Sequence, residues 1–117
     1  MTAQEKSLLL KDLCARLPYG VKVSILGGGS MPLKNLINSS IGWYADVEGA
    51  PTDFSIDEIK PYLHLMSSMT EEETYEYDRL VMCNASWVVD DWLNKNHFDY
   101  RGLIEKELAL EAPEGMY

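Results

Sequence analysis

Cysteine and histidine are scarce in this chain, with two of each among 117 residues. The sequence contains no Cys-x-x-Cys and no His-x-x-x-His pair, the close spacings in which zinc ligands usually occur. We therefore expect no metal site. Cys14 and Cys83 are far apart and flanked by apolar residues, which predicts buried, unpaired thiols in a reducing compartment.

Basic residues are also few: ten Lys and Arg stand against nineteen Asp and Glu, for a net charge of -9. Nucleic acids and anionic membrane surfaces bind proteins that supply cations, so we expect direct binding to neither. No apolar run approaches the roughly 20 residues of a membrane span, and the first residues lack the pattern of a secretory signal. We expect a cytoplasmic protein whose partner is another protein, and the acidic surplus favours a basic one.

Nucleotide-binding motifs are missing as well. Residues 26–32 (LGGGSMP) hold three glycines but lack the Gly-Lys-Ser/Thr and the following helix of a phosphate-binding loop. We expect residues 27–30 to form a loose hairpin connection instead. No motif brings together a nucleophile, a base and an orienting group, so the prediction is no enzyme activity and no cofactor.

The periodicity that is present predicts one α+β domain over residues 1–117. A first helix starts near residue 3 and ends at Pro18 and Gly20. Its leucines and Cys14 are expected to face the core. Its charged side chains, placed on the solvent side, are Lys6, Lys11, Asp12 and Arg16.

Alternating apolar residues then predict an antiparallel meander of three to four strands. These strands are expected at residues 21–26, 33–37, 41–47 and 52–56. An SH3-like barrel is one form that such a meander takes. Residues 55–69 are predicted to add a short helical turn, because Ile56, Ile59 and Leu63 fit helical spacing and Pro61 limits its length.

Two to three helices packed on the sheet are predicted for the C-terminal half. Thr70 and Glu73 form a capping box for the first of them. Ser86 is expected to cap the second, with a buried stripe at Val88, Val89, Trp92 and Leu93. Asp99 is expected to cap a last short helix that ends before Pro113.

The candidate interaction residues lie near the second of these helices. Asp90 and Asp91 are neighbours on a helix and point about 100° apart, so they cannot act as a tight carboxylate pair, but they can extend an exposed acidic face. We expect that face to continue through Glu105, Glu107 and Glu111. The turn after this helix gathers His97, Asp99, Tyr100 and Arg101, the densest polar and aromatic group in the chain. This group is interpreted either as a helix stop followed by a new cap or as a recognition patch.

Three stretches resemble a family of small uncharacterised proteins of gut anaerobic bacteria, often encoded near phage-like or mobile genes. They are residues 8–23 (LLLKDLCARLPYGVKV), 59–73 (IKPYLHLMSSMTEEE) and 91–117 (DWLNKNHFDYRGLIEKELALEAPEGMY). The resemblance implies a bacterial cytoplasmic protein with an accessory role, and it implies no catalytic residue or cofactor.

Three functions remain open from the sequence. The first is a regulatory or accessory protein that binds another protein through its acidic surface. The second is a small enzyme or ligand-binding protein with a pocket near His97 and Asp99. The third is a nucleic-acid mimic of phage origin that blocks a defence protein. The position of His97 separates the first two, because a pocket-lining histidine favours a ligand site and a flat exposed one favours protein binding.

Overall fold

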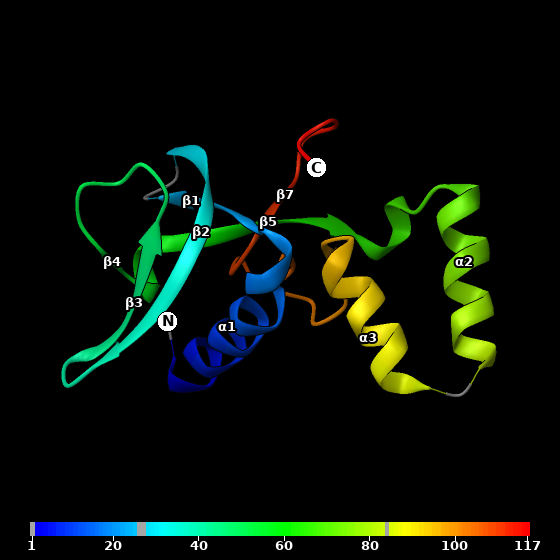
Figure 1. Ribbon diagram of the computed structural model, residues 1–117, viewed down its shortest axis with the longest axis horizontal. Coiled ribbons are helices and arrows are strands. Elements are labelled where there is room, and N and C mark those ends of the chain that lie inside the picture. The colour runs from blue at the N-terminus through cyan, green and yellow to red at the C-terminus, as the bar shows by residue number, and fades with distance from the viewer. Residues whose placement is uncertain (1, 26–27, 84) are drawn as a thin grey trace.

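The computed structural model describes residues 2–25, 28–83 and 85–117. The fold is α+β, as predicted, with a helix first, a mainly antiparallel sheet next and two helices in the C-terminal half (Figure 1). In chain order the elements are α1 (Ala3–Arg16), the 3₁₀ turn η1 (Leu17–Tyr19), β1 (Lys22–Ile25), β2 (Gly28–Ser39), β3 (Gly42–Val47), β4 (Phe54–Ser55), η2 (Ile56–Glu58), β5 (Ile59–Leu65), η3 (Met66–Ser68), α2 (Glu71–Met82), α3 (Ser86–Lys95), β6 (Phe98–Asp99) and β7 (Leu110–Glu111).

The first helix begins and ends at strong local signals. The Thr2 side chain accepts a hydrogen bond from the Glu5 N–H at 3.1 Å, and the Glu5 carboxylate accepts one from the Thr2 N–H at 2.9 Å. This capping box satisfies two backbone groups that a helix leaves unpaired at its start. The chain then passes through η1, which contains Pro18, and turns at Gly20 with a φ of 69°. The predicted end of the helix is confirmed.

The sheet has the strand order β4-β3-β2-β1-β5-β6, and β7 also pairs with β5. Strands β1 to β4 form the predicted antiparallel meander. Strand β5 is antiparallel to β1, whereas β6 and β7 run parallel to β5. Among the described residues no pairing joins β4 to β6, so the hydrogen bonds between strands do not close a barrel.

The predicted helical turn at residues 55–69 is wrong for most of its length. Ile56–Glu58 and Met66–Ser68 form short 3₁₀ turns at its two ends, and Ile59–Leu65 between them form strand β5. Ile59, Pro61 and Leu63 are buried and alternate with half-buried neighbours, the period of two that a strand requires. Because β5 pairs with β1, β6 and β7, which all lie far from it in the sequence, pairing with distant segments decides its conformation.

The glycine-rich segment is less of a loop than predicted. Gly28, Gly29 and Ser30 belong to β2, and Gly28 pairs with Ile25 of β1. The Tyr62 hydroxyl donates a hydrogen bond to the Gly29 carbonyl at 2.8 Å, which fixes this part of the strand from β5. The remaining residue of the predicted connection, Gly27, lies outside the described residues.

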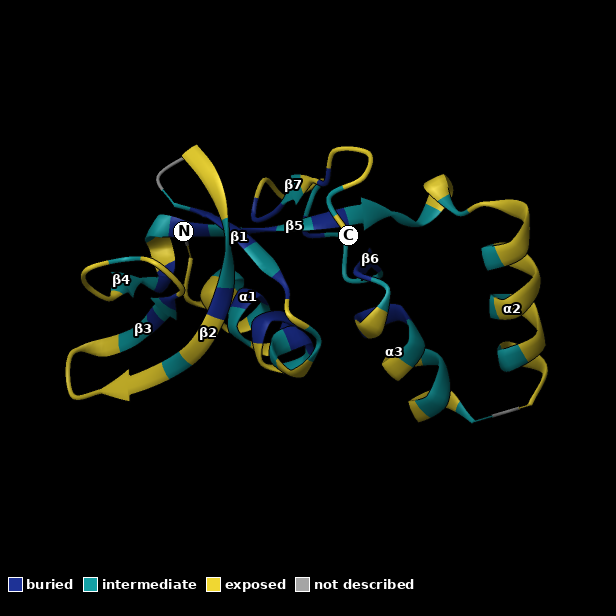
Figure 2. Cartoon of the chain, turned by 45° about the horizontal axis from the view of Figure 1, so that its top comes forward, coloured by how far each residue is buried: buried dark blue, intermediate teal, exposed yellow. Residues whose placement is uncertain are grey.

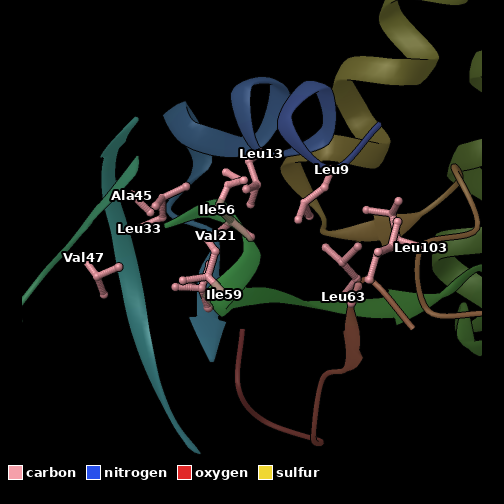
Figure 3. Packing of buried hydrophobic residues seen from close by; sticks show 13 residues of the cluster. Leu9, Leu13, Val21, Leu33, Ala45, Val47, Ile56, Ile59, Leu63 and Leu103 are labelled. Carbon is pink, nitrogen blue, oxygen red and sulfur yellow. The ribbon is translucent and has the colours of Figure 1, made fainter. Parts of the chain in front are cut away.

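The hydrophobic core lies between α1 and the sheet. In Figure 3, Leu9 and Leu13 project from α1 toward the strands, where Ile59 and Leu63 of β5 lie. All four side chains are fully buried. The predicted inward face of α1 is therefore confirmed for its leucines. It is wrong for Cys14, which is exposed.

Helices α2 and α3 form where the sequence places them, but their caps differ. The predicted capping box of α2 is confirmed, because Thr70 and Glu73 exchange hydrogen bonds of 2.9 and 3.2 Å. The prediction that Ser86 caps α3 is wrong. Ser86 is the first residue of α3, and Ala85 stands at the cap position, where it has no side-chain oxygen to offer.

The predicted last helix does not form. Asp99 does cap the following segment, since its carboxylate accepts hydrogen bonds from the backbone N–H groups of Leu103 and Ile104, both at 2.9 Å. The chain then turns at Glu107, which has a φ of 62°, and continues into β7. The cap is therefore present, but no helix follows it. Leu103, Leu108 and Ala109 pack into the hydrophobic core instead, and the chain continues into β7, which pairs with β5.

Helix α2 does not pack on the sheet as predicted. It lies at the far end of the molecule and packs against α3, with the rings of Tyr77 and Trp92 6.1 Å apart (Figures 1 and 2). None of its twelve residues, all of them described, is buried. Helix α3 connects α2 to the body, because Trp92 stacks on the buried ring of Phe98 in β6. We call α2 and α3 together the helical arm. No helix of the described residues is long and apolar enough to cross a membrane.

Candidate functional site

The predicted recognition turn lies largely inside the molecule. His97 and Asp99 are buried, with exposed fractions of 5% and 8%, and Tyr100 and Arg101 are half-buried. Both carboxylate oxygens of Asp99 accept the hydrogen bonds of the cap described above. The side chains of this turn therefore make contacts within the fold and present no continuous exposed patch.

Arg101 belongs to a buried ionic network that the sequence did not reveal. The Asp12 carboxylate is fully buried and accepts from Arg16 Nε at 3.0 Å and from Arg101 Nη1 at 2.7 Å. The fully buried Arg16 also donates to the carbonyl oxygens of Phe98 and Leu93, at 2.5 and 3.5 Å. The prediction that Asp12 and Arg16 face solvent is wrong. The network connects α1 to the end of α3 and to β6, which is a structural role.

Tyr100 lies against both guanidinium groups of this network. Its ring centroid is 4.3 Å from the Arg101 guanidinium carbon and 5.6 Å from that of Arg16. Its hydroxyl donates to the Asn94 side-chain oxygen at 3.0 Å. Cation–π contacts of this kind stabilise a buried arginine without a further carboxylate. Tyr100 thus completes the network instead of offering its ring to a partner.

His97 is held in an unusual conformation. Its φ of 59° is in the left-handed region, which few residues other than glycine adopt, and its ring stacks on Tyr117 with centroids 3.8 Å apart. Its Nδ1 atom is buried and has no hydrogen-bond partner among the described residues. Burial lowers the pKa of His97 from 6.5 to about 4, and the charge of Arg16 acts in the same direction. The ring is therefore neutral at pH 7.

The position of His97 meets neither of the two criteria set from the sequence. It does not lie on a flat exposed face, because it is buried. It also does not line the neighbouring cavity of about 410 Å³, whose walls include His64, Phe98 and Glu111. A ligand pocket built around His97 and Asp99 has no support in this geometry.

The pH dependence of stability is expected to report the buried, neutral state of His97. The unfolded chain binds a proton near pH 6.5 and the folded chain only near pH 4, so stability falls as the pH falls through this window. After allowance for solvent screening, we expect a loss of about 2 kcal/mol in the free energy of unfolding. Urea titrations at pH 7 and pH 4.5 measure it. His97→Asn, which tolerates a positive φ, should reduce the loss, and an equal loss in both proteins would refute the assignment.

Asp90 and Asp91 are exposed on α3, as predicted. Asp91 accepts a hydrogen bond from the Tyr19 hydroxyl, which raises the pKa of that tyrosine. Exposure is also confirmed for the other members of the expected acidic surface, which are Glu105, Glu107 and Glu111.

The helical arm concentrates two kinds of exposed side chain. Helices α2 and α3 hold seven acidic residues and two basic ones, a net charge of -5 out of -9 for the whole chain. Of the large hydrophobic side chains that are exposed among the described residues, four of seven lie on the arm. They are Tyr75 (73% exposed), Val81 (46%), Met82 (85%) and Trp87 (75%). Val81, Met82 and Trp87 lie where α2 ends and α3 begins, and we call these three residues the arm tip.

The remaining sequence predictions concern metals and thiols. The described residues contain no group of three or more His, Cys, Asp and Glu side chains placed to hold a metal ion. Cys14 and Cys83 are free, as predicted, but both are exposed, so the expectation that they are buried is wrong. Cys83 directly follows the last residue of α2, next to the arm tip.

Comparison with known proteins finds no matching family model, no matching curated protein and no matching solved structure.

Proposed function

We propose that this protein is a non-enzymatic binding protein whose helical arm docks on a basic surface of another protein. The observation that carries the proposal is the arm tip, where Met82 and Trp87 expose 85% and 75% of their surface within an acidic pair of helices. Large apolar side chains clustered on a surface mark sites of protein association, and tryptophan is enriched among the residues that dominate binding energy.

The acidic and the large hydrophobic side chains of the helical arm would contribute to binding in different ways. The carboxylates of the arm, including Asp90 and Asp91, would attract a basic partner and speed the encounter. The arm tip would hold the complex by burying apolar surface. Because α2 has no buried residue, its exposed side chains are not explained by packing of the core. Binding to a partner would explain why these side chains are exposed.

We further propose a cytoplasmic location in a bacterium and an accessory or regulatory role. The support is the resemblance of three stretches of the chain to small bacterial proteins and the presence of two free thiols, which persist in reducing compartments. The expected partner class is a protein, and the acidic surplus remains the reason to exclude direct contact with nucleic acid.

Affinity purification from the native host tests the proposal, with the wild-type chain compared against a Met82→Ser/Trp87→Ser double variant. We expect the wild type to capture a basic protein that the double variant loses. With the purified partner, Trp87→Ala should weaken binding about 30-fold or more, as for other interface hot spots. Asp90→Asn/Asp91→Asn should mainly slow association, and the effect should shrink at high salt.

The matched control is Ile41→Ser. The exposed fraction of Ile41, 81%, is similar to the 85% of Met82. Ile41 lies in the turn between β2 and β3 and so does not belong to the helical arm. This variant should capture the same partner as the wild type. All of these positions are exposed, so each variant should keep its free energy of unfolding within about 0.5 kcal/mol. Equal capture by the arm variant and the control variant would show that the arm is not the binding surface.

A further inference from the structure

A groove of about 380 Å³ lies between α1 and the beginning of β3. Both elements lie at the opposite end of the molecule from the helical arm (Figure 1). Lys6, Ser7 and Leu10 of α1 form one wall, and Trp43 and Tyr44 of β3 contribute to the other. The groove differs from the pocket expected near His97 in both its residues and its position. Its volume falls in the lower part of the range for small-molecule sites, about 300–1,000 Å³.

The groove is lined by one basic residue, in a chain with a surplus of acidic ones. Lys6 is the single charged residue among the described residues that line it, and no carboxylate does so, although the chain carries nineteen acidic residues. Lys6 Nζ lies 3.1 Å from Asp57, in a pair whose side chains are 48% and 43% exposed. Exposed pairs of this kind contribute little to stability, so Lys6 can exchange Asp57 for the anionic group of a ligand.

The apolar part of the groove is firmly held. Leu10 and Trp43 are partly buried and pack against the hydrophobic core, so their positions are set by the fold. Ile41, which is 81% exposed, forms the rim. An indole and a phenol beside aliphatic side chains suit a flat aromatic molecule, which gains from offset stacking as well as from burial. The hydroxyl of Ser7 offers a hydrogen-bond donor near the lysine.

We propose that this groove binds a small planar aromatic molecule that carries one carboxylate. The aromatic part would lie against Trp43 and Leu10, and the carboxylate would bind Lys6 and Ser7. The size of the groove suits one or two fused rings and leaves no room for a folded partner. The groove is separate from the helical arm, so this proposal can be tested independently of the function proposed above.

The test is a titration of the isotope-labelled full chain with 2-naphthoate, followed by amide NMR shifts. We expect saturable shifts at Ser7, Gly42 and Tyr44, with a dissociation constant of about 1 mM or tighter for a probe of this size. The neutral analogue 2-naphthalenemethanol should bind more weakly. Lys6→Gln should weaken naphthoate binding about two- to fivefold, the effect of one exposed ion pair.

Two matched controls keep the result interpretable. Lys11→Gln changes another exposed lysine of α1, outside the groove, and should leave the affinity unchanged. Trp87→Leu removes the exposed indole of the arm tip and should also have no effect, whereas Trp43→Leu should weaken binding. Three results would overturn the proposal. They are the absence of saturable shifts, shifts centred on the arm tip, and equal affinity for the acid and the alcohol.

Discussion

Replacing Asp12 with alanine is expected to lower the free energy of unfolding by about 3–5 kcal/mol. The Asp12 carboxylate is fully buried and accepts hydrogen bonds from Arg16 and Arg101. Without it, the fully buried guanidinium of Arg16 keeps its carbonyl partners and the Tyr100 ring but loses the carboxylate that balances its charge. A loss of this size is a large share of the 5–15 kcal/mol that stabilises a typical domain. Urea denaturation followed by circular dichroism measures it.

Neighbouring substitutions separate the loss of the network from general damage to α1. Lys11→Ala changes the exposed residue before Asp12 and should cost no more than about 0.5 kcal/mol. Arg101→Ala removes the more exposed of the two arginines and should cost less than Asp12→Ala. Asp12→Asn keeps a hydrogen-bond acceptor and supplies a folded variant if the alanine protein does not fold. Equal stabilities for Asp12→Ala and Lys11→Ala would contradict the proposed role of the network.

The sequence predicts those parts of the fold that depend on local chemistry. The capping box of α2 is visible as Thr70 and Glu73 three residues apart, and the structure contains both of its hydrogen bonds. Gly20 ends the first helical segment because glycine adopts the left-handed backbone there without steric cost. The alternation in β3 is equally local, since Ala45 and Val47 are buried and Asp46 between them is half-buried.

The parts that failed depend on segments far apart in the chain. Residues 56, 59 and 63 fit a helix, and residues 59, 61 and 63 fit a strand, so periodicity alone could not decide. Pairing of β5 with β6 and β7 decided it. The prediction that Asp12 and Arg16 face solvent was wrong for the same reason. Charged residues usually face solvent, and the partners that allow burial here, Arg101 and the carbonyl of Phe98, are more than 80 residues away.

The exposed residues of the helical arm were also predicted only in part. The exposure of Asp90 and Asp91 followed from their position opposite the apolar stripe of α3. The exposure of Trp87 and Met82 could not be inferred, because an apolar residue on an amphipathic helix is expected to find a packing surface. Among the described residues α2 packs mainly against α3, and the side chains of the arm tip stay exposed.

Leu63→Ala is the second substitution expected to have a large effect, with a loss of about 2–5 kcal/mol in the free energy of unfolding. Leu63 is fully buried on β5, where Figure 3 shows it beside Leu103 and on the side of the strand that faces Leu9 of α1. Its carbonyl also accepts the Ala112 N–H at 2.7 Å, so the segment around it is held from several sides and cannot easily collapse into the space left by the side chain. Incomplete collapse is what makes such cavities costly.

Leu65→Ala provides the matched control, because Leu65 has the same side chain at the end of the same strand but is only half-buried. The loss for Leu65→Ala should be clearly smaller, since less apolar surface leaves water when this residue folds. Urea titrations of the two variants under the same conditions give the comparison. If both substitutions cost the same, or if Leu63→Ala costs less than about 1 kcal/mol, β5 does not occupy the centre of the core.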